Sequence, residues 1–130
     1  MLYTTYLRQI NNIPDTARKI LIMQYKQKGL DKYDLEWIPE LAPANFNAYK
    51  FEAKITKQEM FVEYKEQLER SPAKEKVDEI ISSLEKDEDV FVICCEKDLS
   101  TCHRRILAQH IKDLTGFEWE EYKGGIAIWQ

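Results

Sequence analysis

The residue types best suited to catalysis lie together in one short stretch, CCEKDLSTCHRR at positions 94–105. All three cysteines of the chain fall within it, together with His103, one of the two histidines. A thiol near a helix N-terminus and beside His or Arg has a stabilised thiolate, so it is a better nucleophile. We therefore consider Cys94 and Cys102 as candidate nucleophiles, and His103 with Glu96 as a candidate acid–base pair.

The same stretch carries groups that suit an anionic ligand. If a helix begins near Cys102, its first turn offers free backbone N–H groups and the positive end of the helix dipole. Arginine side chains add planar forks that match carboxylate or phosphate. The candidate ligand-binding residues are Arg104, Arg105, Lys97, Ser100 and Thr101. We expect a small anionic ligand here, phosphorylated or nucleotide-like.

Structural roles for the same residues stay open. Cys94 and Cys95 end an apolar run, where one or both can pack into the core as small hydrophobes. Strand alternation directs the two side chains to opposite faces, so only one of them is expected at a pocket. Glu96 can orient His103 or pair with Arg104, and a surface salt bridge that supports the loop is an equal alternative.

Spacing argues against several standard sites. The arginine position of a cysteine-phosphatase loop is occupied by Ser100 when counted from Cys94, and no CxxC pair is present. Cys94, Cys102, His103 and His110 could in principle gather around zinc, but adjacent Cys102 and His103 match zinc motifs poorly. Glycine-rich phosphate loops are absent from the sequence. We therefore predict no metal and no cofactor.

The elements that must position this stretch are a strand and a helix. Residues 90–95 (VFVICC) form the strongest strand pattern in the chain. A helix is predicted from Cys102 to Thr115, with Ser100 or Thr101 as its cap and Gly116 as its end. In open α/β sheets, ligands bind at the carboxyl ends of strands, where such loops emerge.

Further elements follow from the same kinds of pattern. Strands are predicted at 1–6, 19–25 and 117–122, and an ordered segment without a regular period at 32–47. One helix is predicted from Lys57 to about Arg70, and a second one follows it as far as Leu84. A turn is predicted at Gly124–Gly125, before an apolar stretch at 126–129. Thr56 with Glu59 predicts a capping box, and Ser71 is expected to cap the next helix with Pro72 in its first turn. The sequence predicts one three-layer α/β domain over residues 1–130, with a mostly parallel sheet.

Composition limits the partners. The net charge is −4 and the pI is near 5.3, so the overall field repels nucleic acid, which is not an expected partner. No apolar window approaches the roughly 18 residues that a membrane span needs, so no membrane partner is expected. No secretion signal opens the chain, and clustered cysteines are not typical of a disulfide scaffold. A cytoplasmic location is predicted, and a homodimer is compatible with these features.

The pattern Cys94-x-Glu96-Lys97-Asp98, followed after three residues by Cys102-His103-Arg104, closely resembles the signature of a bacterial family, domain of unknown function 488. The opening YTTYLRQINNIP, the segment LAPANFNAYK, FVEYKEQL and the closing FEWEEY fall in matching order. The resemblance implies a compact Rossmann-like fold with the signature loop at the carboxyl edge of the sheet. It marks Cys94, Glu96, Cys102, His103 and Arg104 as the site, and it implies no reaction.

Three classes of function therefore remain. An enzyme would use the cysteines or the His103–Glu96 pair. A non-catalytic module that senses or sequesters a nucleotide would need the arginines and aromatic side chains but no reactive thiol. An accessory role in nucleic-acid processing is the third class, and it must overcome the acidic net charge.

Overall fold

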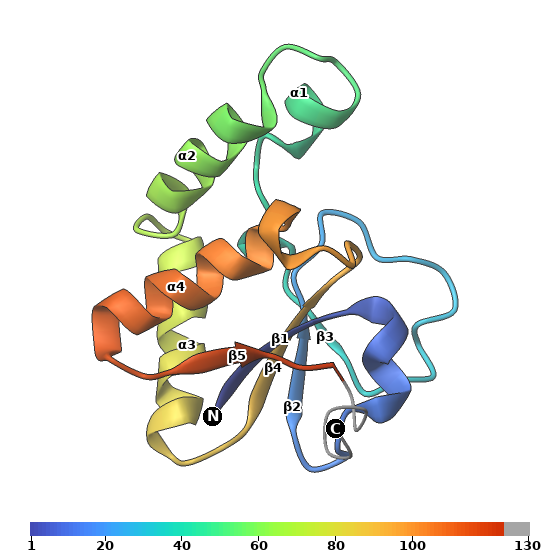
Figure 1. Cartoon of the computed structure of the whole chain (residues 1–130), viewed down its shortest axis with the longest axis vertical. Coiled ribbons are helices and arrows are strands. Elements are labelled where there is room, and N and C mark those ends of the chain that lie inside the picture. The colour runs from blue at the N-terminus through green and yellow to red at the C-terminus, as the bar shows by residue number, and fades with distance from the viewer. Residues whose placement is uncertain (124–130) are drawn as a thin grey trace.

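A five-stranded sheet with helices packed on it carries the cysteine-containing loop (Figure 1). The computed structural model describes residues 1–123. Its elements in chain order are β1 (Leu2–Tyr6), η1 (Leu7–Asn12), β2 (Arg18–Leu21), β3 (Glu36–Trp37), η2 (Pro39–Leu41), α1 (Phe46–Lys50), α2 (Lys57–Gln67), α3 (Ala73–Glu85), β4 (Val90–Cys94), η3 (Leu99–Thr101), α4 (His103–Thr115) and β5 (Trp119–Glu121), where η marks a 3₁₀ helix.

The sheet is parallel throughout, with the strand order β3-β2-β4-β1-β5. At its centre, Val92 of β4 lies opposite Thr4 of β1 and Ile20 of β2. Every residue of β4 is buried, as expected of a strand that is covered on both faces. The order differs from the 3-2-1-4-5-6 order of doubly wound dinucleotide-binding sheets, because β4 separates β2 from β1. The predicted α/β domain with a mostly parallel sheet is confirmed.

The two faces of the sheet are covered differently. On one face Ile20 and Val92 belong to a core cluster that includes side chains of α2, α3 and α4. On the other face Leu21 and Phe91 pack with Leu30 and other side chains from loops and from η1. The third layer therefore consists of η1 and loops rather than α-helices (Figure 1).

Several helix ends follow from local hydrogen bonds. The predicted capping box is present: the Thr56 hydroxyl accepts from the Glu59 N–H at 3.1 Å, and the Glu59 carboxylate accepts from the Thr56 N–H at 3.0 Å. Gly116 ends α4 with a φ of 81°, as predicted. The predicted cap at Ser71 is wrong, because Pro72 occupies the N-cap position of α3 and the Ser71 hydroxyl donates to Glu75 instead.

Two predicted segments differ from the structure. β2 ends at Leu21 rather than Tyr25. The last backbone hydrogen bond to β4 runs from the Ile22 N–H to the Ile93 carbonyl, and the chain then leaves the sheet. The segment at 32–47 contains β3, η2 and the start of α1, elements too short to show a period. The turn at 124–125 and the stretch at 126–129 lie outside the described residues. Within residues 1–123, no helix has the length and apolar character that a membrane crossing requires.

Candidate functional site

The loop between β4 and α4 folds through one extra turn before the helix begins. The Asp98 carboxylate accepts from the Ser100 N–H at 3.0 Å and from its hydroxyl at 2.7 Å, and so caps η3. α4 then starts at His103, with Cys102 at its N-cap position and no side-chain hydrogen bond there. The prediction that Ser100 or Thr101 caps α4 is wrong, because both residues lie in η3 and Cys102 occupies the N-cap position of α4.

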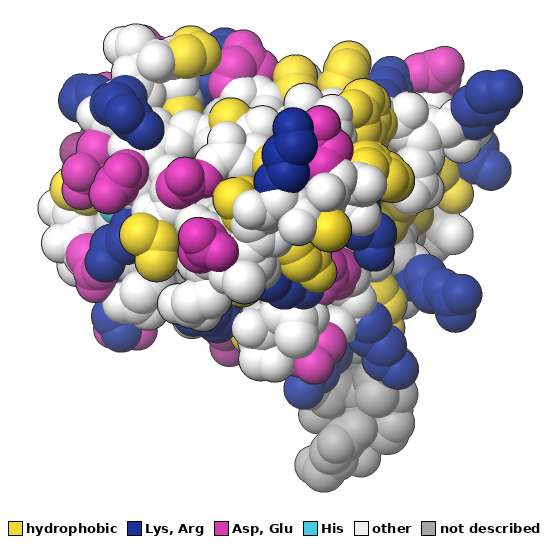
Figure 2. Space-filling view, turned by 90° about the horizontal axis from the view of Figure 1, so that it is seen from above, with side chains coloured by type: hydrophobic (Ala, Val, Ile, Leu, Met, Phe, Trp, Pro, Cys, Tyr) yellow, Lys and Arg dark blue, Asp and Glu magenta, His cyan; other side chains and the backbone are white. Residues whose placement is uncertain are grey.

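A cavity of about 210 Å³ lies beside this loop at the carboxyl edge of the sheet. Most of its lining side chains are apolar or aromatic, and a few are polar or charged. Its lining residues are Met23, Gln24, Tyr25, Gln27, Pro43, Phe46, Tyr49, Lys57, Met60, Phe61, Cys94, Cys95, Glu96, Thr101 and His103. Figure 2 views the molecule from the side of α1 and α2, where hydrophobic side chains lie between acidic and basic ones.

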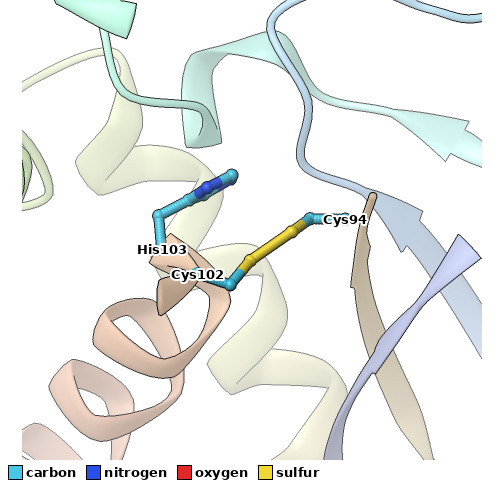
Figure 3. A group of neighbouring side chains, drawn as sticks. All are labelled: Cys94, Cys102 and His103. Atoms are coloured by element: carbon cyan, nitrogen blue, oxygen red, sulfur yellow. A yellow bond between two sulfur atoms is a disulfide. The ribbon is translucent and has the colours of Figure 1, made fainter. Parts of the chain in front are cut away.

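Cys94, which lines the cavity, is joined to Cys102 by a disulfide (Figure 3). Cys94 ends β4 and Cys102 precedes α4, and each residue is only 1% exposed. Their Cα atoms are 7.6 Å apart. Since a disulfide sulfur carries no thiolate, the predicted nucleophilic roles of both cysteines require the reduced form.

His103 lies beside the disulfide (Figure 3). Its Nε2 is 2.6 Å from the Ile22 carbonyl oxygen, which can only accept, so Nε2 carries the proton. Its ring also meets the Tyr64 ring edge to face, with centroids 5.4 Å apart. Burial lowers the pKa of His103 to about 4, although the Ile22 carbonyl and the Glu96 carboxylate favour the charged form. At neutral pH the imidazole is therefore uncharged, with a free lone pair on Nδ1.

Arg104 is completely buried, and its guanidinium holds the loop in place through hydrogen bonds. Nε and Nη2 donate to the two carboxylate oxygens of Glu121 at 3.1 and 2.7 Å. Nη1 donates to the Glu96 carbonyl at 2.5 Å and lies 3.6 Å from the Cys94 sulfur, while Nη2 also donates to the Lys97 carbonyl at 3.1 Å. When the weak hydrogen bond to the Cys94 sulfur is counted, these contacts engage all five N–H groups. The structure therefore does not support the predicted contact between Arg104 and a ligand, and it favours a structural role.

Glu96 faces the cavity with two partners that were not predicted for it. Its carboxylate accepts from the Lys57 ammonium at 3.2 Å and from the Thr101 hydroxyl at 2.7 Å. The Lys57 ammonium also lies 5.8 Å from the centre of the Tyr49 ring and 5.8 Å from that of Phe61. The carboxylate forms no ion pair with Arg104, which bonds to the Glu96 carbonyl instead.

Cys95 is exposed and also lines the cavity, so both neighbouring cysteines border it. The expectation that only one of them does so is wrong, because β4 ends at Cys94 and strand alternation stops there. Desolvation of the sulfur, followed by the nearby Glu96 carboxylate, raises the pKa of the Cys95 thiol. Cys95 is thus a protonated thiol at neutral pH rather than an activated nucleophile.

The remaining candidate residues lie around the site in different places. Thr101 lines the cavity, whereas Lys97, Ser100 and Arg105 lie outside its lining. Lys97 and Ser100 are exposed, and Arg105 is partly buried. Of the predicted groups, the cavity therefore brings together Cys94, Glu96, Thr101 and His103, while Cys102 reaches it through the disulfide.

Sequence reasoning missed Lys57 and Glu121, the two charged partners of the loop. Both are distant from residues 94–105 in the chain, so only the fold brings them close. A weak signal was available for Lys57, because the capping box fixes it as the first residue of α2. For Glu121, the alternating FEWEEY pattern predicted a strand but not a partner. Among the aromatic residues, Tyr49 lines the cavity, whereas Trp37 lies outside its lining and donates to the Met23 carbonyl.

A family model described as "Active DUF488-N3 subclade" matches residues 3–115. The chain belongs to the DUF488 family. The match covers the sheet from β1 through β4 and the whole of α4, so this DUF488 protein carries its complete cysteine-containing loop within the family region. No curated protein and no solved structure gave a significant match.

Proposed function

We propose that this DUF488 protein binds a small, ring-bearing anion of the nucleotide-like class in the cavity at the carboxyl edge. The observation that carries the proposal is the composition of the lining, in which aromatic side chains lie next to a paired cation and carboxylate. A cavity of about 210 Å³ is smaller than the roughly 300–1,000 Å³ of drug-sized sites. It therefore suits one ring, with the rest of the ligand at the mouth.

The aromatic and the charged side chains would recognise different parts of such a ligand. Tyr49, Phe46 and Phe61 offer aromatic faces for a planar ring. Lys57 supplies a positive charge for the anionic group, and the Glu96 carboxylate can accept from a ring N–H. The N-terminus of α4, which is the positive end of the helix dipole, lies at His103, another lining residue. The net charge of −4 favours a small ligand over nucleic acid.

The cysteines and His103 would supply chemistry only in the reduced protein. A reducing cytoplasm, the location that we propose, would keep the two sulfurs as thiols. The Arg104 guanidinium, 3.6 Å from the Cys94 sulfur, would then favour its thiolate. The uncharged His103 imidazole would be free to accept a proton.

Thermal unfolding of the reduced protein with purine and pyrimidine nucleotides, nucleosides and inorganic phosphate tests the binding proposal. A ligand at about 100 times its Kd stabilises the folded state by about 2.7 kcal/mol, so a nucleotide should raise Tm measurably. Lys57→Met should abolish the rise, whereas Lys54→Met, at an exposed position outside the lining, should leave it unchanged. If no nucleotide, nucleoside or phosphate shifts Tm, the proposal is refuted.

A non-catalytic binding module is the second candidate, and the raised pKa of the Cys95 thiol favours it. Alkylation of the reduced protein by iodoacetamide separates the two. In a Cys95→Ser background, fast alkylation of Cys94 that nucleotide blocks would support catalysis. Slow alkylation at neutral pH would support the binding module.

A further inference from the structure

Three side chains with metal-binding atoms lie close together beside the cavity, and two of them, Cys94 and His103, line it. The sulfurs of Cys94 and Cys102 and one ring nitrogen of His103 all lie within 4.8 Å of one another. Among residues 1–123 they form the only such group of three Cys, His or acidic side chains. Figure 3 shows the imidazole directly beside the two sulfurs. The spacing of these residues matches no metal-binding motif. They come together because the chain turns through η3 and so brings Cys102 back to the end of β4.

The surroundings of His103 are those of a metal ligand. Histidines that bind metals usually donate the other ring N–H to a carbonyl or carboxylate, which fixes the tautomer and the ring orientation. Here Nε2–H donates to the Ile22 carbonyl at 2.6 Å. Nδ1 is therefore the nitrogen with a lone pair, on a ring that is further held by Tyr64.

The two cysteines also suit a shared ligand. Their Cα atoms are 7.6 Å apart, whereas Cα atoms of bonded cysteines are usually about 4.4–6.8 Å apart. This backbone separation leaves room for two sulfurs around one ion. The Arg104 guanidinium next to Cys94 adds a positive charge that stabilises a thiolate in a buried place.

We propose that reduced Cys94 and Cys102, together with His103, bind one thiophilic divalent metal ion such as Zn²⁺. Zinc sites with three protein ligands of the Cys₂His type keep a fourth position for water or substrate. Because Cys94 and His103 line the cavity, an open fourth position would be within reach of a molecule bound there. The inference shares the cavity with the proposed function, yet it is tested without any organic ligand, so either can fail alone.

Reduction must precede metal binding. A phosphine reductant breaks the S–S bond, takes the oxygen of one water molecule to become a phosphine oxide, and leaves both sulfurs as thiols. Each thiol then releases its proton to solvent as its sulfur binds the ion.

Anaerobic titration of the reduced protein with Co²⁺, followed by displacement with Zn²⁺, tests the inference. We expect sulfur-to-cobalt charge-transfer absorption that saturates at one ion per chain and disappears when Zn²⁺ is added. Cys94→Ser and Cys102→Ser should each lose this absorption. Cys95→Ser, which removes the exposed thiol of the same cavity, should keep it, and Lys57→Met should bind Co²⁺ as the wild type does while losing nucleotide.

Absence of charge-transfer absorption in the wild type, or its persistence in Cys94→Ser, overturns the inference. If circular dichroism shows that the serine variants do not fold, X-ray absorption of the zinc-loaded wild type decides instead. Two sulfur ligands and one imidazole nitrogen around zinc support the site, and a zinc ion without sulfur ligands refutes it.

Discussion

Arg104 shows how one side chain can shape a site that it does not enter. Its guanidinium joins the backbone of the loop, through the carbonyls of Glu96 and Lys97, to the Glu121 carboxylate on β5. The pair is buried, with exposed side-chain fractions of 0% for Arg104 and 11% for Glu121. Loss of one partner would leave the other charged in a poorly solvated place. The loop, and with it the carboxylate of Glu96, therefore depends on this ion pair.

Arg104→Lys and Glu121→Gln should destabilise the protein to a similar extent. Breaking a buried pair by removing one partner costs about 3–5 kcal/mol, and each substitution keeps part of the contacts, so we expect about 2–4 kcal/mol. Glu96→Gln should have a much smaller effect, because its carboxylate pairs with the partly exposed Lys57. Urea unfolding of the three variants measures these differences.

Arg105→Lys serves as the matched control for Arg104→Lys. Arg105 is the next residue in α4, is partly exposed and lies outside the cavity lining, so its stability should stay within about 0.5 kcal/mol of the wild type. Unchanged stability in Arg104→Lys, combined with lost nucleotide binding, would contradict the bracing role and restore Arg104 as a ligand contact.

At the scale of elements, the cavity lies between the β4–α4 loop and the start of α2. Lys57 is the first residue of α2, and Met60 and Phe61 follow one turn later on the same wall. The capping box of Thr56 and Glu59 fixes where this helix begins. The cation of the cavity is thus positioned by the N-terminal hydrogen bonds of α2.

Thr56→Ala should lower the free energy of unfolding by about 1 kcal/mol, within the range of about 0.5–2 kcal/mol for lost helix caps. It should also weaken nucleotide binding, because fraying of the first turn releases Lys57. Gln58→Ala, at an exposed position in the same turn, is the control and should change neither property. Denaturant unfolding and the nucleotide-dependent shift of Tm measure the two effects. Lower stability with normal nucleotide binding would show that the start of α2 does not position the cation.

For the whole molecule, local patterns predicted the elements and long-range contacts decided the site. The apolar run at 90–95 and the helical period after Cys102 place β4 and α4 close to where the structure has them. The partners of Arg104, Glu96 and His103 come from β5, from α2 and from Ile22, directly after β2, and no local spacing encodes such contacts. The disulfide was missed for a similar reason, since close spacing of cysteines is not by itself a sign of pairing.

The stability of the whole molecule should fall in mild acid, partly because of His110. Burial lowers the pKa of His110, although Glu69 and Asp113 oppose the shift. Below the ordinary histidine pKa of about 6.5, the unfolded chain therefore binds a proton that the folded chain does not. This contribution to stability is complete above that pH and is lost as the pH falls towards the lowered pKa. The free energy of unfolding, measured in urea between about pH 7.5 and about pH 5.5, should decrease in the wild type and decrease less in His110→Gln. An equally steep decrease in the variant would show that His110 is not the group responsible.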